Sequence, residues 1–229
     1  MAYRKVDDAS LTAVADSIRE KGGTSGALAF PDGFVSAVQA IQAGGGEADS
    51  SFKDVIEGTA VNPRLPGDLT KIGNYTFYNF ANLYLTALPD GVTSIGNYAF
   101  YNCSKLALTS LPDGVTSIGT YTFYYCTNLA LTSLPAGLKN IGSNAFYYCT
   151  NLALTSLPAG VTSIGSYAFF NCTSLTSITF EGTPKTISSD AFRSCYNLTT
   201  INVPWAEGAV ANAPWGATNA TINYNYTGS

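Results

Sequence analysis

Histidine is absent from all 229 residues, and charged residues make up only 11% of them, with 11 Lys and Arg against 15 Asp and Glu. An average soluble domain carries about 25% charged residues. Without histidine, the chain lacks the commonest general base and the commonest metal ligand. The net charge of −4 leaves no basic surface of the kind that nucleic-acid binding requires. We therefore expect no metal, no cofactor and no nucleic-acid partner.

Long hydrophobic runs are missing as well. No stretch approaches the ~18 consecutive apolar residues of a membrane-spanning helix. The N-terminal segment MAYRKVDDASL carries charges, but the apolar run of a secretory signal peptide does not follow them. We expect a protein that is made in the bacterial cytoplasm and does not insert into a membrane.

The carboxylates that could serve catalysis stand alone in the sequence. Glu57, Glu181, Asp190 and Glu207 have no acidic partner at a regular spacing. A glycosidase needs two carboxyl groups about 5–10 Å apart. The sequence therefore predicts a protein without enzymatic activity.

A 23-residue repeat occupies most of the chain, with the unit IGxx(A/T)Fxx(C)xxLxLTSLPxGVTS. Isoleucine, phenylalanine and leucine each recur six times at this step: Ile72, Ile95, Ile118, Ile141, Ile164 and Ile187; Phe77, Phe100, Phe123, Phe146, Phe169 and Phe192; Leu83, Leu106, Leu129, Leu152, Leu175 and Leu198. One such unit is too short to bury its own apolar side chains, so units must stack on one another. Stacked coils place equivalent residues about 4.8 Å apart, the spacing of neighbouring strands. The repeat predicts a solenoid.

The cysteines follow the same step and take the same position in five units: Cys103, Cys126, Cys149, Cys172 and Cys195. The first unit has Phe80 there, which indicates a position used for apolar volume and not for bonding. Five is an odd number, and stacked side chains that point in parallel disfavour a disulfide. We predict five buried free thiols that behave as small hydrophobic groups.

The repeat resembles the BspA-type (Treponema-type) leucine-rich repeat, whose pattern is close to IGxxAFxxCxxLxxIxIPxxVxx, over about residues 55–204. The resemblance implies an α+β solenoid of leucine-rich repeats and a role in adhesion. One departure stands out. The last two copies read CTSLTSITF and CYNLTTINVP and match the LxxIxI strand, whereas earlier copies read LALTSLP with leucines at other offsets.

Four regions follow from these patterns: a helical module at 1–42, a linker at 43–50, the solenoid at 51–204 and a C-terminal cap at 205–229. Ser10 can cap a first helix, and Pro31 can open a second one. The module resembles N-terminal segments of phage and prophage tail-type proteins of gut bacteria. Its apolar faces are expected to anchor the protein or to form a homotrimer, or else to cap the first coil: Leu11, Val14, Ile18, Phe34, Val38 and Ile41.

Three columns of equivalent residues flank the core phenylalanines. We name them the Tyr75 column (Tyr75, Tyr98, Tyr121, Asn144, Tyr167), the Tyr78 column (Tyr78, Tyr101, Tyr124, Tyr147, Phe170) and the Asn79 column (Asn79, Asn102, Tyr125, Tyr148, Asn171). Tyrosine provides broad, rigid contact area with a polar end, which binding surfaces favour. The resemblance implies that the Tyr75 column is the more structural one. The predicted ligand-binding residues are Tyr78, Tyr101, Tyr124, Tyr125, Tyr147, Tyr148, Phe170, Asn102 and Asn171.

Three functions fit these observations. The first is a non-enzymatic virion component of a phage or prophage, a fibre or decoration protein. Its N-terminal module would contact other virion proteins, and its solenoid would contact a glycan or protein of the bacterial surface. The second is a bacterial cell-surface adhesin that binds host protein or glycan. The third is a structural spacer, in which the aromatic columns serve only to stabilise the solenoid.

Overall fold

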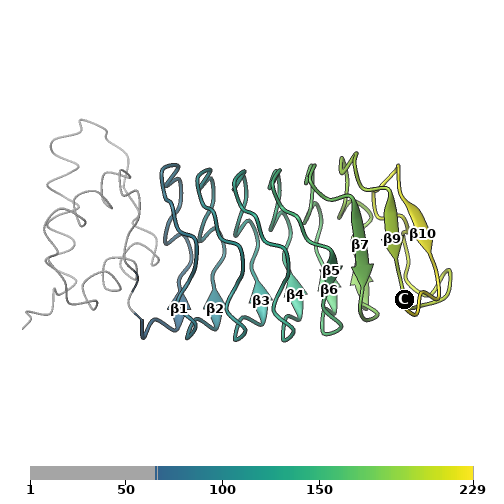
Figure 1. The fold of residues 1–229 in the computed structure, drawn as a ribbon, viewed down its shortest axis with the longest axis horizontal. Helices are drawn as coiled ribbons and strands as arrows, with labels where there is room; N and C mark the ends of the chain where they lie inside the picture. The colour runs from purple at the N-terminus through teal and green to yellow at the C-terminus, as the bar shows by residue number, and fades with distance from the viewer. Residues whose placement is uncertain (1–64, 66, 229) are drawn as a thin grey trace, which may run out of the picture.

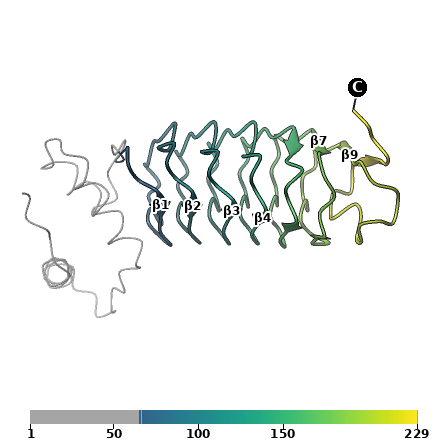
Figure 2. The same ribbon diagram turned by 90° about the horizontal axis from the view of Figure 1, so that it is seen from below.

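The computed structural model describes residue 65 and residues 67–228 and shows them as a β-solenoid of about seven turns. The coils follow one another along a single axis from the first strand to the last (Figures 1 and 2). These residues form strands and turns and no α-helix, so none of them provides a helix that could span a membrane. The predicted helical module of residues 1–42, the linker 43–50 and the module's oligomerisation residues lie outside the described part of the chain. The structure therefore confirms a leucine-rich-repeat-like solenoid, and the helical part of the expected α+β fold stays a prediction.

A first parallel sheet runs along the solenoid in the order β1-β2-β3-β4-β6-β8. Its strands have two residues each: β1 Lys71–Ile72, β2 Ser94–Ile95, β3 Ser117–Ile118, β4 Asn140–Ile141, β6 Ser163–Ile164 and β8 Thr186–Ile187. In every strand the isoleucine is buried and the residue before it is exposed or half-buried. The glycine that follows permits close stacking, because a Cβ added to Gly142 would lie 2.6 Å from the carbonyl carbon of Gly119.

A second parallel sheet, in the order β10-β9-β7-β5, occupies only the C-terminal coils. Its strands are β5 Ser156–Leu157, β7 Ser177–Phe180, β9 Thr200–Asn202 and β10 Thr221–Asn223. In β7, Ile178 and Phe180 are buried and alternate with more exposed residues, as a half-buried strand requires. The sheet is longest where the sequence reads LxxIxI. In LALTSLP the buried leucines are spaced by two and then by three residues, which breaks this alternation.

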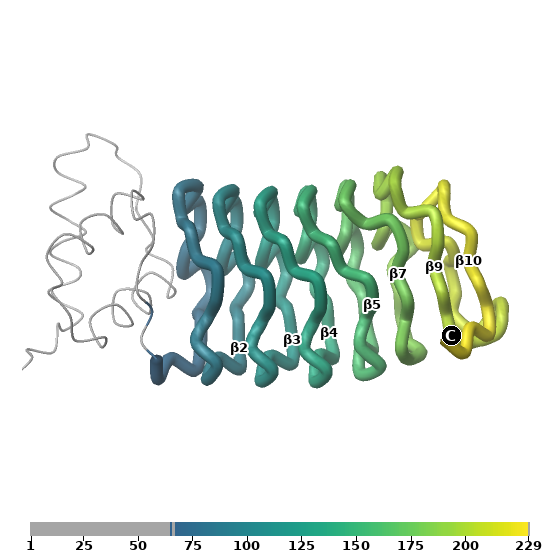
Figure 3. The backbone as a smooth tube through the Cα atoms, in the orientation of Figure 1, coloured from purple at the N-terminus to yellow at the C-terminus, as the bar shows by residue number. Residues whose placement is uncertain are grey.

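The C-terminal segment adds one more strand to the second sheet. Strand β10 pairs in parallel with β9, and Ile222 lies opposite Ile201. Trp205 and Trp215 are both buried and pack against each other with ring centroids 6.3 Å apart. The tube in Figure 3 shows this last turn, in yellow, at the far end of the solenoid from β1.

The phenylalanines of the repeat form a continuous ladder through the core, which we call the inner ladder (Phe77, Phe100, Phe123, Phe146, Phe169 and Phe192). Each of these side chains is 1% exposed or less. Consecutive rings are stacked with centroids 5.0–5.5 Å apart. The predicted isoleucines, phenylalanines and leucines are all buried in a single cluster, so the core is confirmed as the sequence predicts it.

All five cysteines are free and buried, as predicted. Their position provides the predicted apolar volume and, in addition, a hydrogen bond between coils. Each thiol donates a hydrogen bond to the carbonyl oxygen of the inner-ladder phenylalanine 26 residues earlier, at 2.9–3.1 Å. For Cys149 the acceptor is Phe123 in the preceding coil, with an Sγ–O distance of 3.0 Å. The thiol therefore ties neighbouring coils together while it fills the core, an option that the periodicity alone does not reveal.

Candidate functional site

The backbone next to the inner ladder turns the aromatic columns outward. The N–H groups of Tyr121 and Phe123 donate to the carbonyl oxygens of Ser143 and Ala145 in the next coil, at 3.0 and 2.8 Å. Tyr121 has a φ of 57° and Tyr125 a φ of 58°, so left-handed residues stand on both sides of the buried phenylalanine. The side chains that flank the core ring are consequently only partly buried and share one face of the solenoid.

The Tyr78 column is an unbroken stack. Its neighbouring ring centroids are 4.5–4.7 Å apart, and the ring planes differ by 7–17°. Tyr78, at the N-terminal end, is 37% exposed, and the rings behind it are half-buried by their neighbours. These separations lie at the short end of the 4.5–7 Å range in which aromatic pairs attract each other.

The Asn79 column runs beside it and carries the remaining predicted residues. Tyr125 and Tyr148 stack with centroids 4.7 Å apart. Tyr148 also packs against Tyr147 of the Tyr78 column, at 5.1 Å. The amide of Asn102 donates to the Asn79 side chain at 3.2 Å. The structure thus places the predicted ligand-binding residues in two adjacent columns; their binding role stays a prediction.

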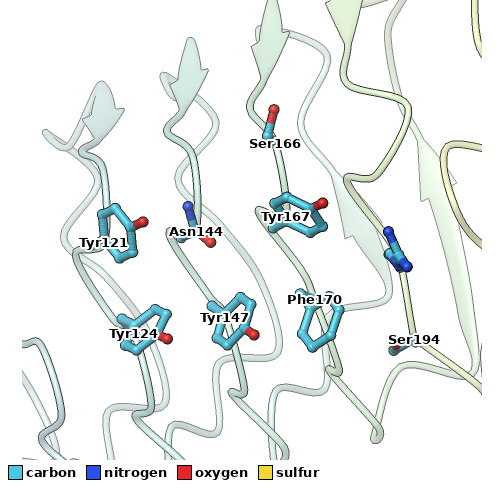
Figure 4. A pocket seen from close by; sticks show the side chains of 9 residues that line it. Tyr121, Tyr124, Asn144, Tyr147, Ser166, Tyr167, Phe170 and Ser194 are labelled. Atoms are coloured by element: carbon cyan, nitrogen blue, oxygen red, sulfur yellow. The ribbon is translucent and has the colours of Figure 1, made fainter.

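The Tyr75 column stacks in the same way but is interrupted. Tyr75, Tyr98 and Tyr121 have successive centroids 4.8 Å apart. Asn144 occupies the next rung, and Tyr167 resumes the column beyond it (Figure 4). The short amide leaves the space of a ring unfilled.

A hollow of about 700 Å³ opens at this interruption. Aromatic rings of the Tyr75 and Tyr78 columns line it, together with Asn144, Ser166 and Ser194 (Figure 4). Arg193 belongs to the same lining. Sequence reasoning did not include Asn144, Tyr121, Tyr167 or Arg193 among the binding residues. The signal was present, because Asn144 is the one member of the Tyr75 column that is not tyrosine, and Arg193 stands where the sixth repeat would continue the Tyr78 column.

The columns carry little charge. Burial first, and neighbouring tyrosines second, raise the pKa of Tyr98, Tyr101 and Tyr147 above its ordinary value and that of Tyr124 to about 12. The hydroxyl groups therefore stay protonated at neutral pH. Arg193 lies 3.7 Å from Asp190, and both side chains are well exposed. The face offers hydroxyl, amide and guanidinium groups around aromatic rings, without a net excess of either charge.

The thiols of the described residues are poorly suited to nucleophilic attack. Burial raises the pKa of the Cys195 thiol to about 12 and raises the pKa of the other four thiols above the ordinary range, so these groups are poor nucleophiles. Within the same residues, no three Cys, Asp or Glu side chains gather closely enough to hold a metal ion. The Glu181 carboxylate accepts a hydrogen bond from the Ser156 hydroxyl at 2.7 Å.

Comparison with solved structures finds other bacterial leucine-rich-repeat proteins. The chain is similar to the T. pallidum leucine-rich repeat protein, with 31% identity over 62% of this chain and 72% of that one and a TM-score of 0.55. A leucine-rich repeat protein from Bacteroides ovatus shares 31% identity over 58% of this chain, with a TM-score of 0.47. A leucine-rich cell surface protein from Faecalibacterium prausnitzii shares 29% identity over 59%, with a TM-score of 0.41.

The chain covers only part of the length of these relatives. It spans only 35% of the B. ovatus protein and 43% of the F. prausnitzii protein. No curated protein sequence matches the chain significantly. The family described as BspA type leucine-rich repeat region matches residues 49–158 and 139–208 in six copies, which is well over half of the sequence. The chain therefore belongs to the BspA-type leucine-rich-repeat family.

Proposed function

We propose that this protein is an adhesin-type binding protein of the bacterial cell surface, and that the three aromatic columns bind a glycan or protein of another surface. Membership of the BspA-type family supports this proposal. So does the architecture, since repeat solenoids provide long surfaces that their proteins use for binding. A role in a phage virion gains no support from the comparisons, and the module that would attach it to a particle lies outside the described residues.

The observation that carries the proposal is the backbone conformation of the tyrosines. Six of them have left-handed φ angles of 56–58°: Tyr75, Tyr98, Tyr121, Tyr125, Tyr148 and Tyr167. A bulky side chain in this region strains the backbone, by about 1–3 kcal/mol. Asparagine tolerates the conformation better and occupies it at Asn144 and Asn171 in the same columns.

The rings are therefore kept where a smaller residue would satisfy the backbone more easily. Stacking offsets part of the strain, because each aromatic pair contributes about 0.5–1.5 kcal/mol beyond its burial. The exposed part of each ring is free to contact a ligand, and Tyr75, Tyr78 and Tyr125 are 36–37% exposed. A broad tyrosine surface with amides beside it matches the composition of binding surfaces.

The test is a double variant, Tyr101→Ala with Tyr124→Ala, which removes two central rings of the Tyr78 column. Binding of the purified chain would be measured on a glycan array and on immobilised extracellular-matrix proteins. We expect the double variant to lose at least tenfold in affinity for whichever ligand the native protein binds.

The matched control is Tyr84→Ala with Tyr196→Ala. These two tyrosines are the most exposed of the described chain, at 46% and 62%, and they stand outside the three columns. The control should bind as the native protein does. Equal binding by the Tyr101 and Tyr124 variant, or a native protein that binds nothing in either format, would favour the structural spacer.

A further inference from the structure

The interruption of the Tyr75 column is a property of one side chain and not of the backbone. The N–H of Tyr121 donates to Ser143 at 3.0 Å, and the N–H of Asn144 donates to Ser166 at 2.9 Å. The coils therefore stack here with the same hydrogen-bond ladder as elsewhere. Asn144 has a φ of 56°, within two degrees of the four tyrosines of its column. The asparagine at this rung leaves a notch in an otherwise regular stack.

The width of this notch follows from the rungs beside it. Neighbouring rings of the column are 4.8 Å apart. Tyr121 and Tyr167 are two rungs apart, so their separation along the axis is twice the strand spacing, about 9.6 Å. One ring inserted between them would lie about 4.8 Å from each, within the range of aromatic stacking. The notch therefore has room for a single six-membered ring, and it opens into the hollow of about 700 Å³.

The base of the notch is polar and has no hydrogen-bond partner among the described residues. The half-buried amide of Asn144 has access to solvent and takes part in none of the side-chain hydrogen bonds of the described residues. Other asparagines of the solenoid are engaged: the Asn97 side chain, for example, accepts the N–H of Thr120 at 2.8 Å. An amide that becomes buried under a ligand must find a hydrogen-bond partner in that ligand.

The width of the notch and the unpaired amide at its base together indicate which kind of ligand fits. A phenyl side chain would fill the width but would leave the amide unsatisfied. A pyranose ring has apolar C–H groups on its faces and hydroxyl groups around its edge, so it can face both tyrosines and hydrogen-bond to Asn144 and Ser166 at once. The Arg193–Asp190 pair at the rim balances its own charge, which suits a neutral sugar.

We propose that the notch between Tyr121 and Tyr167 seats one neutral pyranose unit of a glycan, with the next units of the chain lying over Tyr147 and Phe170. This inference rests on the proposed function, and it assigns the ligand class and the central subsite. Asn144 is the residue that determines recognition there, since it provides both the space and the amide.

The experiment fills the notch. Asn144→Tyr restores the regular stack on a backbone that already holds tyrosine at the equivalent positions, so the variant should fold. Two new stacked pairs offset the strain of a tyrosine at this φ, so the melting temperature should stay close to that of the native protein. A glycan array of neutral hexose and N-acetylhexosamine oligosaccharides identifies the best-bound tetrasaccharide, and calorimetry then measures its affinity. We expect Asn144→Tyr to weaken binding at least tenfold.

The matched control is Asn151→Tyr, which makes the same exchange at an exposed position outside the three columns and leaves Asn144 and both flanking tyrosines in place. It should keep binding within about threefold of the native protein. A native-like affinity of Asn144→Tyr would overturn the proposal that the notch binds a pyranose unit. If Tyr101→Ala with Tyr124→Ala still loses binding in that case, the proposed function stands without this subsite. A native protein that binds immobilised proteins but no neutral glycan would also overturn the inference.

Discussion

The inner ladder and the Tyr75 column have nearly the same stacking geometry, but only the Tyr75 column contains a residue without an aromatic ring. Both repeat every 23 residues, and both stack rings about 5 Å apart. The inner ladder keeps phenylalanine at all six rungs and is at most 1% exposed. The Tyr75 column is half-exposed and contains an asparagine at its fourth rung. A missing ring inside would leave a cavity with no contacts, whereas a missing ring outside leaves a hollow that water or a ligand can enter.

The strongest way to test this contrast is to remove an inner ring. Phe123→Ala deletes a side chain with no exposed surface and stacked neighbours at 5.4 and 5.5 Å. We expect the free energy of unfolding to fall by about 3–5 kcal/mol, as measured by urea denaturation. Phe123→Leu, which keeps much of the volume, should lose less than half of that. A loss below about 1 kcal/mol for the alanine variant would contradict the inner ladder as the source of stability.

The second-largest loss of stability is expected when one of the cysteines that link neighbouring coils is replaced. Cys149→Ala removes both buried volume and the thiol hydrogen bond to Phe123. The expected loss in unfolding free energy is about 1–3 kcal/mol. Thr150→Ala, at the neighbouring half-buried position, should cost less stability.

In the native protein none of the five thiols should react with a thiol reagent at pH 8, because they are buried and their pKa values are raised. Fast labelling of native protein would refute their placement.

The matching outer change is Tyr124→Ala, one residue away from Phe123 in the sequence. Its ring stacks on Tyr101 and Tyr147 with centroids 4.7 and 4.6 Å apart, but one edge faces solvent. We expect a loss of about 1–2 kcal/mol in the free energy of unfolding, from the two stacked pairs. The comparison between inside and outside fails if this variant loses as much stability as Phe123→Ala.

The smallest effect, absent at neutral pH, concerns ionisation of the outer rings. The pKa of Tyr124 is raised from 10.0 to about 12 in the folded protein, mainly by burial. A raised pKa means that folding favours the neutral hydroxyl. This contribution to stability is complete below pH 10 and is lost as the pH rises through about 12. Urea denaturation across this pH range should show the decline, and Tyr124→Phe, which has no hydroxyl, should flatten it. A decline that starts near pH 8 would contradict the assignment.

Much of this molecule could be predicted from its sequence because the repeat is exact in step. The buried isoleucines, phenylalanines, leucines and free cysteines were all predictable from a 23-residue period and from the need to stack. The hydrogen bond from each thiol to a phenylalanine carbonyl was not, since it depends on an offset of 26 residues between two coils. The confinement of the second sheet to the C-terminal coils depends on which side chains of LALTSLP and LTSITF are buried, and the repeat does not determine this.

The candidate site, like the fold, was predictable from the sequence only in part. The sequence identified the columns and the predicted residues Tyr101, Tyr124 and Tyr147, but it did not distinguish Asn144 as the centre of a hollow. That role depends on the fold, which places Tyr121 and Tyr167 on either side of Asn144 in the lining of one hollow.

The sequence by itself determined the translation from one coil to the next, because a strict period with apolar residues at fixed offsets can be buried only by stacking equivalent side chains. It also determined which residues form the core. The tertiary structure decided how each coil is rotated about the axis: which rings face solvent, where a thiol meets a carbonyl group and where one absent ring opens a notch. A repeat carries no information on that rotation, because it is set by the left-handed residues and by the hydrogen bonds between coils.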